Sequence, residues 1–153
     1  MDRNIAAKAE LLIRKPVSEV LEAFINPEIT TQFWFTKSSG RLEVGKKIRW
    51  EWEMYNVGSD VEVKAIEPNK RILIEWSGYK APNTVEWIFT PHQNDTTFVG
   101  VTNKGFVGTD DEIVQQALDS TGGFTLLLAG LKALLEHNIR LNLVLDRFPD
   151  NKG

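Results

Sequence analysis

The sequence predicts one α+β domain, spanning residues 1–153, in which a curved antiparallel sheet grips a long C-terminal helix and encloses an apolar pocket. Three observations lead to this fold class. Apolar and polar residues alternate with a period of two between residues 5 and 15, and the same alternation recurs in several short runs through the middle of the chain. Towards the C-terminus, apolar residues recur instead at spacings of three and four, which is typical of a helix with one buried face.

Residues 5–15 form the first predicted strand, because apolar residues at odd positions alternate with mostly polar ones at even positions. Pro16 then begins a short helix, since proline is favoured in a first helical turn, where its missing N–H would have had no partner. Asn26 and Pro27 end this helix and begin another, with Asn26 as its N-cap. We therefore expect two short helices after the first strand, the second of them closed by the aromatic residues 33–35.

Five runs of alternating residues follow, each with one apolar face. Their inward members are expected to be Ile48, Trp50, Trp52 and Met54, then Val61, Val63 and Ala65, then Ile72, Ile74 and Trp76, then Val85, Trp87 and Phe89, and finally Thr97, Val99 and Val101. Turn residues separate the runs at 56–59, 67–70, 81–83 and 93–95. Because these spacers are short, neighbouring strands are predicted to run antiparallel.

The long C-terminal helix is predicted to begin at a capping box. Thr109 stands three residues before Glu112, the spacing at which each side chain can bond the backbone N–H of the other. The Gly122-Gly123 pair is expected to break or kink the helix. Beyond it, one apolar face should be covered by the sheet and consists of Phe124, Leu127, Leu128, Leu131, Leu134 and Leu135.

Composition excludes several functional classes. With 18 basic and 21 acidic side chains, the formal charge of −3 gives no electrostatic reason to bind nucleic acid or anionic lipid. The most apolar segment, 124–135, is shorter than the ~20 residues that span a bilayer, so no membrane insertion is expected. Residues 1–6 lack the apolar stretch of a secretory signal, and the chain has no cysteine. A cytoplasmic location is therefore expected.

Several stretches of the sequence resemble a known family. They lie in the expected order and spacing at 15–24, 32–34, 44–50, 66–72 and 122–124. Together with the order of strand, two short helices, meander and long helix, they resemble the START-like (SRPBCC) helix-grip superfamily, and within it the group named after the activator of Hsp90 ATPase homologue 1. The resemblance covers nearly the whole chain.

The resemblance implies three kinds of function. Members of this superfamily look like pockets for lipids, polyketides or flavonoids, some look like cyclases or hydrolases of aromatic compounds, and the eukaryotic namesake stimulates a chaperone, which implies a role in the stress response. The chain lacks the additional N-terminal domain of that namesake, so chaperone activation is expected less than ligand binding. We expect a small hydrophobic molecule as the partner and keep a chaperone as the alternative.

Aromatic residues give the clearest functional signal. Four tryptophans share the apolar face of successive predicted strands, while the apolar face of the long helix points to the same volume. Such rings either fill the core or wall a pocket for a small molecule. The candidate ligand-binding residues are Trp34, Trp50, Trp52, Trp76, Trp87, Phe106, Phe124, Leu128 and Leu131.

Candidate acid–base groups are sparse. Glu51, Glu53 and Glu75 fall on the polar face of their strands, so they are expected to face water. His92 is expected in a turn and His137 near the end of the long helix, and two isolated histidines do not make a metal site. The sequence also has no phosphate-binding glycine loop and no nucleophile elbow. We therefore expect neither a metal nor another cofactor, and binding is favoured over catalysis.

Overall fold

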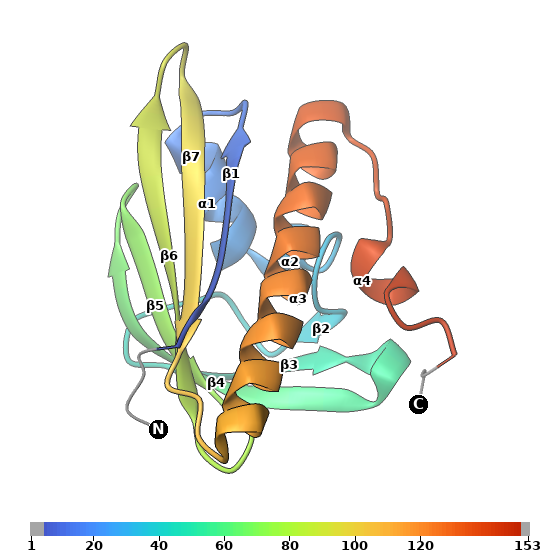
Figure 1. Ribbon diagram of the computed structural model, residues 1–153. Coiled ribbons are helices and arrows are strands. Elements are labelled where there is room, and N and C mark those ends of the chain that lie inside the picture. Colours follow the sequence, from blue (N-terminus) through green and yellow to red (C-terminus); the bar gives the residue numbers. More distant parts are fainter. Residues whose placement is uncertain (1–4, 151–153) are drawn as a thin grey trace.

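The computed structural model describes residues 5–150 and has a curved, seven-stranded antiparallel sheet that faces one long helix, α3 (Figure 1). The strands are ordered β1-β7-β6-β5-β4-β3-β2, so the first strand joins the last and the rest form a meander. The predicted α+β helix-grip architecture is confirmed. Residues 1–4, where the expected absence of a secretory signal partly falls, lie outside the described residues.

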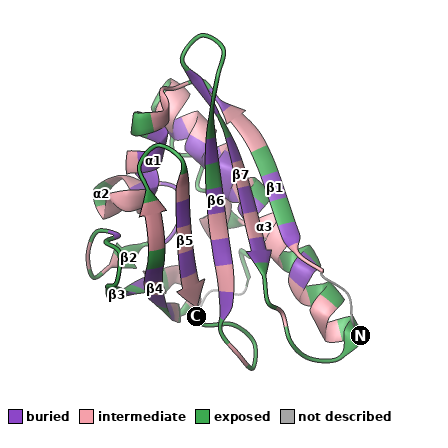
Figure 2. Cartoon of the chain, turned by 90° about the vertical axis from the view of Figure 1, so that its left-hand side faces the viewer, coloured by how far each residue is buried: buried purple, intermediate pink, exposed green. Residues whose placement is uncertain are grey.

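The elements follow one another as the periodicities predict. The strands are β1 (Ala7–Ile13), β2 (Lys37–Ser38), β3 (Lys47–Trp52), β4 (Val57–Glu67), β5 (Arg71–Trp76), β6 (Asn83–His92) and β7 (Thr96–Lys104). The helices are α1 (Val17–Ile25), α2 (Pro27–Thr30), the 3-10 turn η1 (Glu53–Tyr55), α3 (Asp110–His137) and α4 (Leu143–Asp146). Figure 2 shows the sheet from the side away from α3, where buried and exposed residues alternate along the strands.

Helices α1 and α2 close one end of the sheet. Asn26 is the N-cap of α2, as predicted, and its side chain accepts a hydrogen bond from the Glu28 backbone N–H at 3.0 Å. The buried Thr30 hydroxyl donates to the carbonyl of Ala23 at 2.6 Å and so joins α2 to α1. The two short helices therefore pack as one unit.

Helix α3 crosses the concave side of the sheet and is joined to β1 by polar contacts. The Lys132 ammonium donates to the Leu12 carbonyl and to the Glu136 carboxylate, both at 2.7 Å, and the Arg14 N–H donates to the same carboxylate at 2.8 Å. By length and composition α3 could cross a membrane. The apolar residues in its C-terminal half, among them Phe124, Leu127, Leu128 and Leu131, instead lie buried in the core.

The Gly122-Gly123 pair does not interrupt α3, so a break at this point is wrong, and the alternative of a kink stays a prediction. The helix is continuous for 28 residues, and the Arg147 guanidinium lies against both glycines. A Cβ at Gly122 would meet one guanidinium nitrogen at 2.8 Å, and a Cβ at Gly123 would meet the other at 2.9 Å. Each glycine costs a helix about 1 kcal/mol relative to alanine. Here the pair leaves space for a side chain that returns from the C-terminal segment.

The meander differs from the prediction in detail. Met54 lies in η1 rather than in a strand, and β4 begins at Val57, so only Asn56 of the predicted turn at 56–59 has the left-handed backbone of a turn. Asn83 and His92 are the end residues of β6 rather than turn residues. The short elements β2 and α4 lack the length to show a period and were not predicted.

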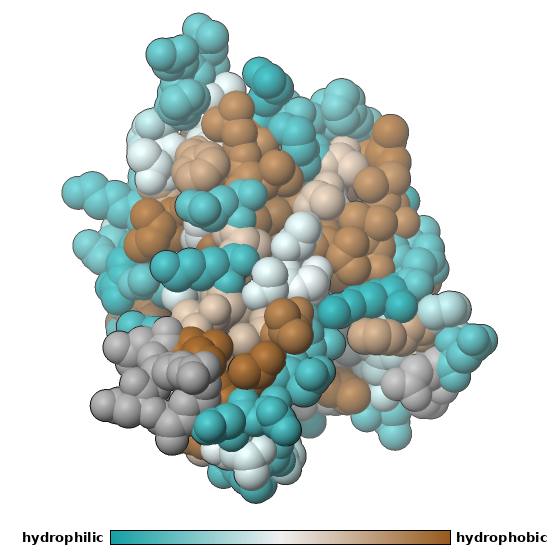
Figure 3. Space-filling view, in the orientation of Figure 1, coloured by the Kyte–Doolittle hydropathy of each residue, from teal (hydrophilic) through white to brown (hydrophobic). Residues whose placement is uncertain are grey.

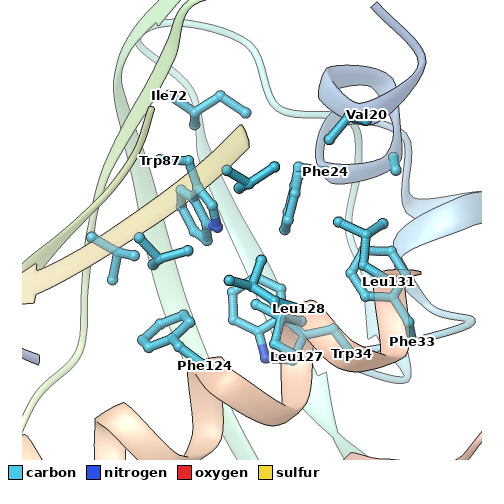
Figure 4. Close-up of a cluster of buried hydrophobic side chains, with 14 of the residues drawn as sticks. Val20, Phe24, Phe33, Trp34, Ile72, Trp87, Phe124, Leu127, Leu128 and Leu131 are labelled. Atoms are coloured by element: carbon cyan, nitrogen blue, oxygen red, sulfur yellow. The ribbon is translucent and has the colours of Figure 1, made fainter. Parts of the chain in front are cut away.

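The core lies between the sheet, α1 and the C-terminal half of α3. Figure 4 shows Trp87 and Ile72 from the sheet, Phe24 from α1 and Leu131 from α3 pointing toward one another. The rings of Phe24 and Trp87 are 5.4 Å apart between centroids. This dense packing is confined to one end of the space between sheet and helix, and the other end is open.

Candidate functional site

A cavity of about 790 Å³ occupies the open end of the space between sheet and helix. The segments around it include η1 with the start of β4, the β5–β6 loop, the end of β7 with the loop that follows, the N-terminal half of α3, and the C-terminal segment around α4. Its volume lies within the range of roughly 300–1,000 Å³ that is usual for small-molecule sites. Eight of the lining residues are aromatic, and Asp119 and Arg147 are the charged ones.

Much of the apolar wall consists of the aromatic side chains Trp34, Trp52, Trp76, Phe106 and Phe124, and Phe148 also contributes to it. Trp34 is central to them, with its ring centroid 6.0 Å from those of both Trp52 and Trp76 and 5.9 Å from that of Phe124. Such edge and tilted contacts hold the rings in fixed orientations. Trp34 also packs against Trp87, at 5.8 Å between centroids, and so separates the cavity from the core.

A chain of polar side chains crosses one side of the cavity. The Trp76 indole N–H donates to Asn83 Oδ1 at 2.6 Å, and Asn103 Nδ2 donates to the same oxygen at 2.7 Å and to the Thr84 carbonyl at 2.8 Å. The Ser120 hydroxyl donates to Asn103 Oδ1 at 2.8 Å. Trp76, Asn83, Asn103 and Ser120 all line the cavity, and we call them the polar relay.

The donor-only indole of Trp76 fixes the direction of every bond in the polar relay. An indole N–H can only donate, so Asn83 must present its oxygen to Trp76 and its amide nitrogen elsewhere. Asn103 must then donate to that oxygen, which leaves its own oxygen to accept from Ser120. Within residues 5–150, Asn83 Nδ2 makes no hydrogen bond, and the Ser120 oxygen accepts none.

Trp34 adds a further donor to the cavity. Its side chain is only 9% exposed, and its indole nitrogen makes no hydrogen bond with any residue that the structure describes. Trp34 lines the cavity, whereas Trp87 does not, and the Trp87 indole nitrogen is buried without a partner among the described residues. Three residues of the cavity lining therefore carry polar atoms without a partner among the described residues: the N–H donors of Trp34 and Asn83 and the acceptor oxygen of Ser120.

The C-terminal segment closes one side of the cavity. The Tyr55 hydroxyl donates to the Val144 carbonyl of α4 and contacts the Leu145 carbonyl at 3.0 Å. Arg147 donates to the Asp119 backbone carbonyl at 3.0 Å and contacts its carboxylate at 3.2 Å. Because Arg147 reaches α3 through the space above the glycine pair, the glycines position this wall of the site.

A second set of contacts fixes the β5–β6 loop against the start of α3. Glu112 accepts hydrogen bonds from the Thr109 N–H at 2.9 Å and from the Tyr79 hydroxyl, and Lys80 lies 3.7 Å from its carboxylate. The predicted capping box is confirmed. The Thr109 backbone bond, followed by the Tyr79 bond, lowers the pKa of Glu112 to about 2. Glu112 is therefore a fixed anion at neutral pH and holds one edge of the cavity.

The Glu112 contacts predict a pH-dependent stability. A carboxyl whose pKa is depressed in the folded protein stabilises it above the ordinary pKa of about 4.5, and this contribution is lost as the pH falls toward 2. The variant Glu112→Gln keeps a side chain that can cap the helix but has no charge. Its melting temperature should lie below that of the wild type at pH 7, and the two should converge between about pH 5 and pH 2. A constant difference over this range would contradict the assignment.

The structure divides the predicted ligand-binding residues into two groups. Trp34, Trp52, Trp76, Phe106 and Phe124 line the cavity, and their contact with a ligand stays a prediction. The remaining four are at most 1% exposed and pack in the core behind the wall. They are Trp50, Trp87, Leu128 and Leu131. They share the inward face of their elements but lie too deep to line the cavity.

Several cavity residues were missed by the sequence reasoning. Asn83, Asn103 and Ser120 form the polar relay, and Arg147 closes the site from a segment with no recognisable period. Asn103 carried a usable signal, because it stands on the apolar face of β7, in register with Val85. A polar residue on a buried face needs hydrogen-bond partners and often marks a site.

The titratable groups offer little for catalysis. Asp119 and Arg147 are the charged residues of the cavity lining, and they contact each other. In residues 5–150 no cluster of three or more histidines, cysteines or carboxylates can hold a metal ion. Glu51 and Glu75 lie outside the cavity, and His92 is exposed at the end of β6. The cavity lining therefore combines aromatic faces with few charged groups.

A helix-grip fold with an aromatic cavity defines a START-like protein, and the sequence places this chain within one group of that class. Residues 14–136 match the family described as activator of Hsp90 ATPase homolog 1-like protein. The chain belongs to this family. No curated protein matches the sequence.

Solved structures share the fold. The protein SSP2350 from Staphylococcus saprophyticus is 29% identical, with a TM-score of 0.75 over 89% of this chain and 95% of that one. DynU16, a putative protein in the dynemicin biosynthetic locus, is 23% identical with a TM-score of 0.76, and the match covers 90% of this chain but 49% of DynU16. The Aha1 protein of Colwellia psychrerythraea, solved as a dimer, is 19% identical with a TM-score of 0.72, covering 87% of this chain and 97% of that one.

Proposed function

We propose that this protein binds a small apolar or aromatic molecule in the cavity between the sheet and α3. The observation that carries the proposal is an aromatic-walled volume of about 790 Å³ that the protein's own side chains leave unfilled. A planar ligand would exchange water for the faces of Trp34, Trp76 and Phe124, and burial of apolar surface would drive binding. Family membership is compatible with this function.

The charges of the cavity favour binding over catalysis. General acid–base work needs a titratable group within reach of the reacting atoms. Asp119 is the one carboxylate among the lining residues that the structure describes, and it is paired with Arg147. The polar relay consists of amide, indole and hydroxyl groups, which do not titrate near neutral pH. A cyclase or hydrolase activity on aromatic compounds therefore has less support.

Trp76→Ala should weaken ligand binding about tenfold or more. The ring of Trp76 is half-buried, forms part of the wall and lies 6.0 Å from Phe124, so its removal takes one face from the ligand. Affinity would be measured by calorimetric titration with apigenin, a planar trihydroxyflavone. In the wild type, ligand binding should shift the backbone amide NMR signals of both α3 and the strands of the wall. The dissociation constant should lie in the micromolar range, which corresponds to a binding free energy of about 7–8 kcal/mol.

Leu12→Ala is the matched control for this experiment. Leu12 pairs with the exposed Phe98 on the outer face of the sheet, so its truncation should leave the affinity unchanged. If a broad set of flavonoids, polyketides and fatty acids gave no binder, or if the shifts clustered on the outer face of the sheet, the proposal would be wrong.

A second candidate is a chaperone-associated role in the stress response, with a cytoplasmic location. Membership of a family described by an activator of Hsp90 ATPase supports it. Figure 3 shows apolar patches separated by hydrophilic side chains on the face that carries α3 and α4, and the exposed apolar residues after α3 include Ile139 and Leu141. Pull-down with purified Hsp90 tests this role. Capture by the chaperone, together with an inert cavity, would favour it over ligand binding.

A further inference from the structure

From the polar relay, we infer that the cavity selects a neutral aromatic molecule that carries both a carbonyl oxygen and a hydroxyl group. The inference rests on the proposed binding function and names the chemistry of its ligand. It depends on three polar atoms without a partner in the part of the chain that the structure describes: the indole nitrogen of Trp34, Nδ2 of Asn83 and the hydroxyl oxygen of Ser120.

The two N–H groups call for an acceptor on the ligand. Trp34 and Asn83 are at most 9% exposed, so an apolar ligand that displaced water from the cavity would leave their N–H groups unsatisfied. Asn83 cannot turn its amide around, because its oxygen already accepts from Trp76 and Asn103. A carbonyl oxygen of the ligand would satisfy these donors.

The Ser120 oxygen calls for a donor on the ligand. The Ser120 hydroxyl donates its proton to Asn103 Oδ1. Asn103 presents its oxygen to Ser120 because its amide nitrogen donates to Asn83 and to the Thr84 carbonyl. The lone pairs of the Ser120 oxygen therefore remain for a group that brings its own proton. A phenol or alcohol hydroxyl has this property, and a carboxylate or an ether does not.

The charges of the cavity argue against an anionic ligand. Arg147 is the one cation among the described lining residues, and its guanidinium contacts Asp119 and the ring of Phe148, 4.9 Å away. A carboxylate would therefore lose its hydration without gaining a free cation. This separates the proposed ligand class from free fatty acids, which share its apolar character.

Three probes with one ring skeleton test the inference on the wild-type protein. Apigenin has a carbonyl and three hydroxyls, flavone has the carbonyl alone, and a flavone carboxylic acid adds an anion. Calorimetric titrations should show apigenin binding roughly two- to tenfold more tightly than flavone, the usual range for one net hydrogen bond, and the carboxylate binding most weakly.

The variant Ser120→Ala tests the role of the relay. It should reduce the ratio of the flavone to the apigenin dissociation constant to about one. Only apigenin can donate to the Ser120 oxygen, and alanine removes that acceptor. The ratio is measured within one variant, so any loss of stability common to both titrations cancels. Thr125→Ala is the control: Thr125 is an exposed hydroxyl residue on the same helix, bonded to the Thr121 carbonyl, and its loss should leave the ratio unchanged.

The outcomes distinguish the two proposals. If flavone and apigenin bind the cavity of the wild type equally well, or if Ser120→Ala keeps the full preference for apigenin, the inference about ligand chemistry is wrong and the binding function stands. Tightest binding of the carboxylate would likewise overturn it. If none of the probes, and no member of the broader ligand set, binds in the cavity, both the binding function and the inference fail.

Discussion

Leu131→Ala is expected to lower the free energy of unfolding by about 2–5 kcal/mol. Leu131 is 0% exposed in the C-terminal half of α3 and points into the cluster formed with Phe33 and Phe24 (Figure 4). Removing its side chain beyond Cβ takes apolar surface out of the core and leaves a cavity, because the strands and α1 around it are held by their own packing. Chemical denaturation of the wild type and the variant would measure the change, with the dependence of the unfolding free energy on denaturant concentration held in common.

Leu118→Ala is the matched control on the same helix. Leu118 is 62% exposed, on the part of α3 that lies beside the cavity rather than on the core. Its truncation should change the free energy of unfolding by less than about 0.5 kcal/mol. A loss of that small size at Leu131 as well would show that the C-terminal half of α3 does not carry the core.

The α+β architecture could be predicted because each long element repeats a pattern. In β6, Val85, Trp87 and Phe89 are all buried while the residues between them are not, as a period of two requires. Capping residues fixed the start of α3 at Thr109 and of α2 at Asn26, because each cap depends only on neighbours within three residues. Local chemistry therefore decided these boundaries.

Features that depend on distant residues could not be predicted. Gly122 and Gly123 suggested a break, yet they are helical, and the side chain that packs against them, Arg147, comes more than twenty residues later. The polar relay likewise joins residues on β5, β6, β7 and α3. Spacing along the chain does not show which polar residues on different elements will meet.

The division between wall and core was also beyond the sequence. Trp50, Trp76 and Trp87 share the inward face of the sheet, but Trp76 ends β5 and reaches the cavity, whereas Trp87 lies in mid-strand beneath Phe24 and Trp34. Alternation tells which face a side chain occupies and nothing of its depth. The polar partners make the distinction: the indole of Trp76 has one in Asn83, and that of Trp87 has none among the described residues.

Trp87 therefore gives the second prediction of large effect. Trp87→Ala should destabilise the protein by about 3–5 kcal/mol, the usual range for a buried aromatic residue. Trp87→Phe should cost much less, roughly 2 kcal/mol or below. It keeps most of the contact with Phe24 and removes an N–H that is buried without a partner, which itself costs about 1–3 kcal/mol. Chemical denaturation of both variants measures the two losses.

The pair Trp87→Phe and Trp76→Phe then tests where the core ends and the site begins. Trp87→Phe should leave the affinity for apigenin within about twofold, because the indole does not line the cavity. Trp76→Phe removes one of the two donors that orient the Asn83 amide, so the carbonyl-binding group is held less firmly, and apigenin and flavone should both bind more weakly. If Trp87→Phe weakened apigenin binding as much as Trp76→Phe does, the ligand would have to reach behind Trp34, and the wall of the site would lie deeper than the cavity lining shows.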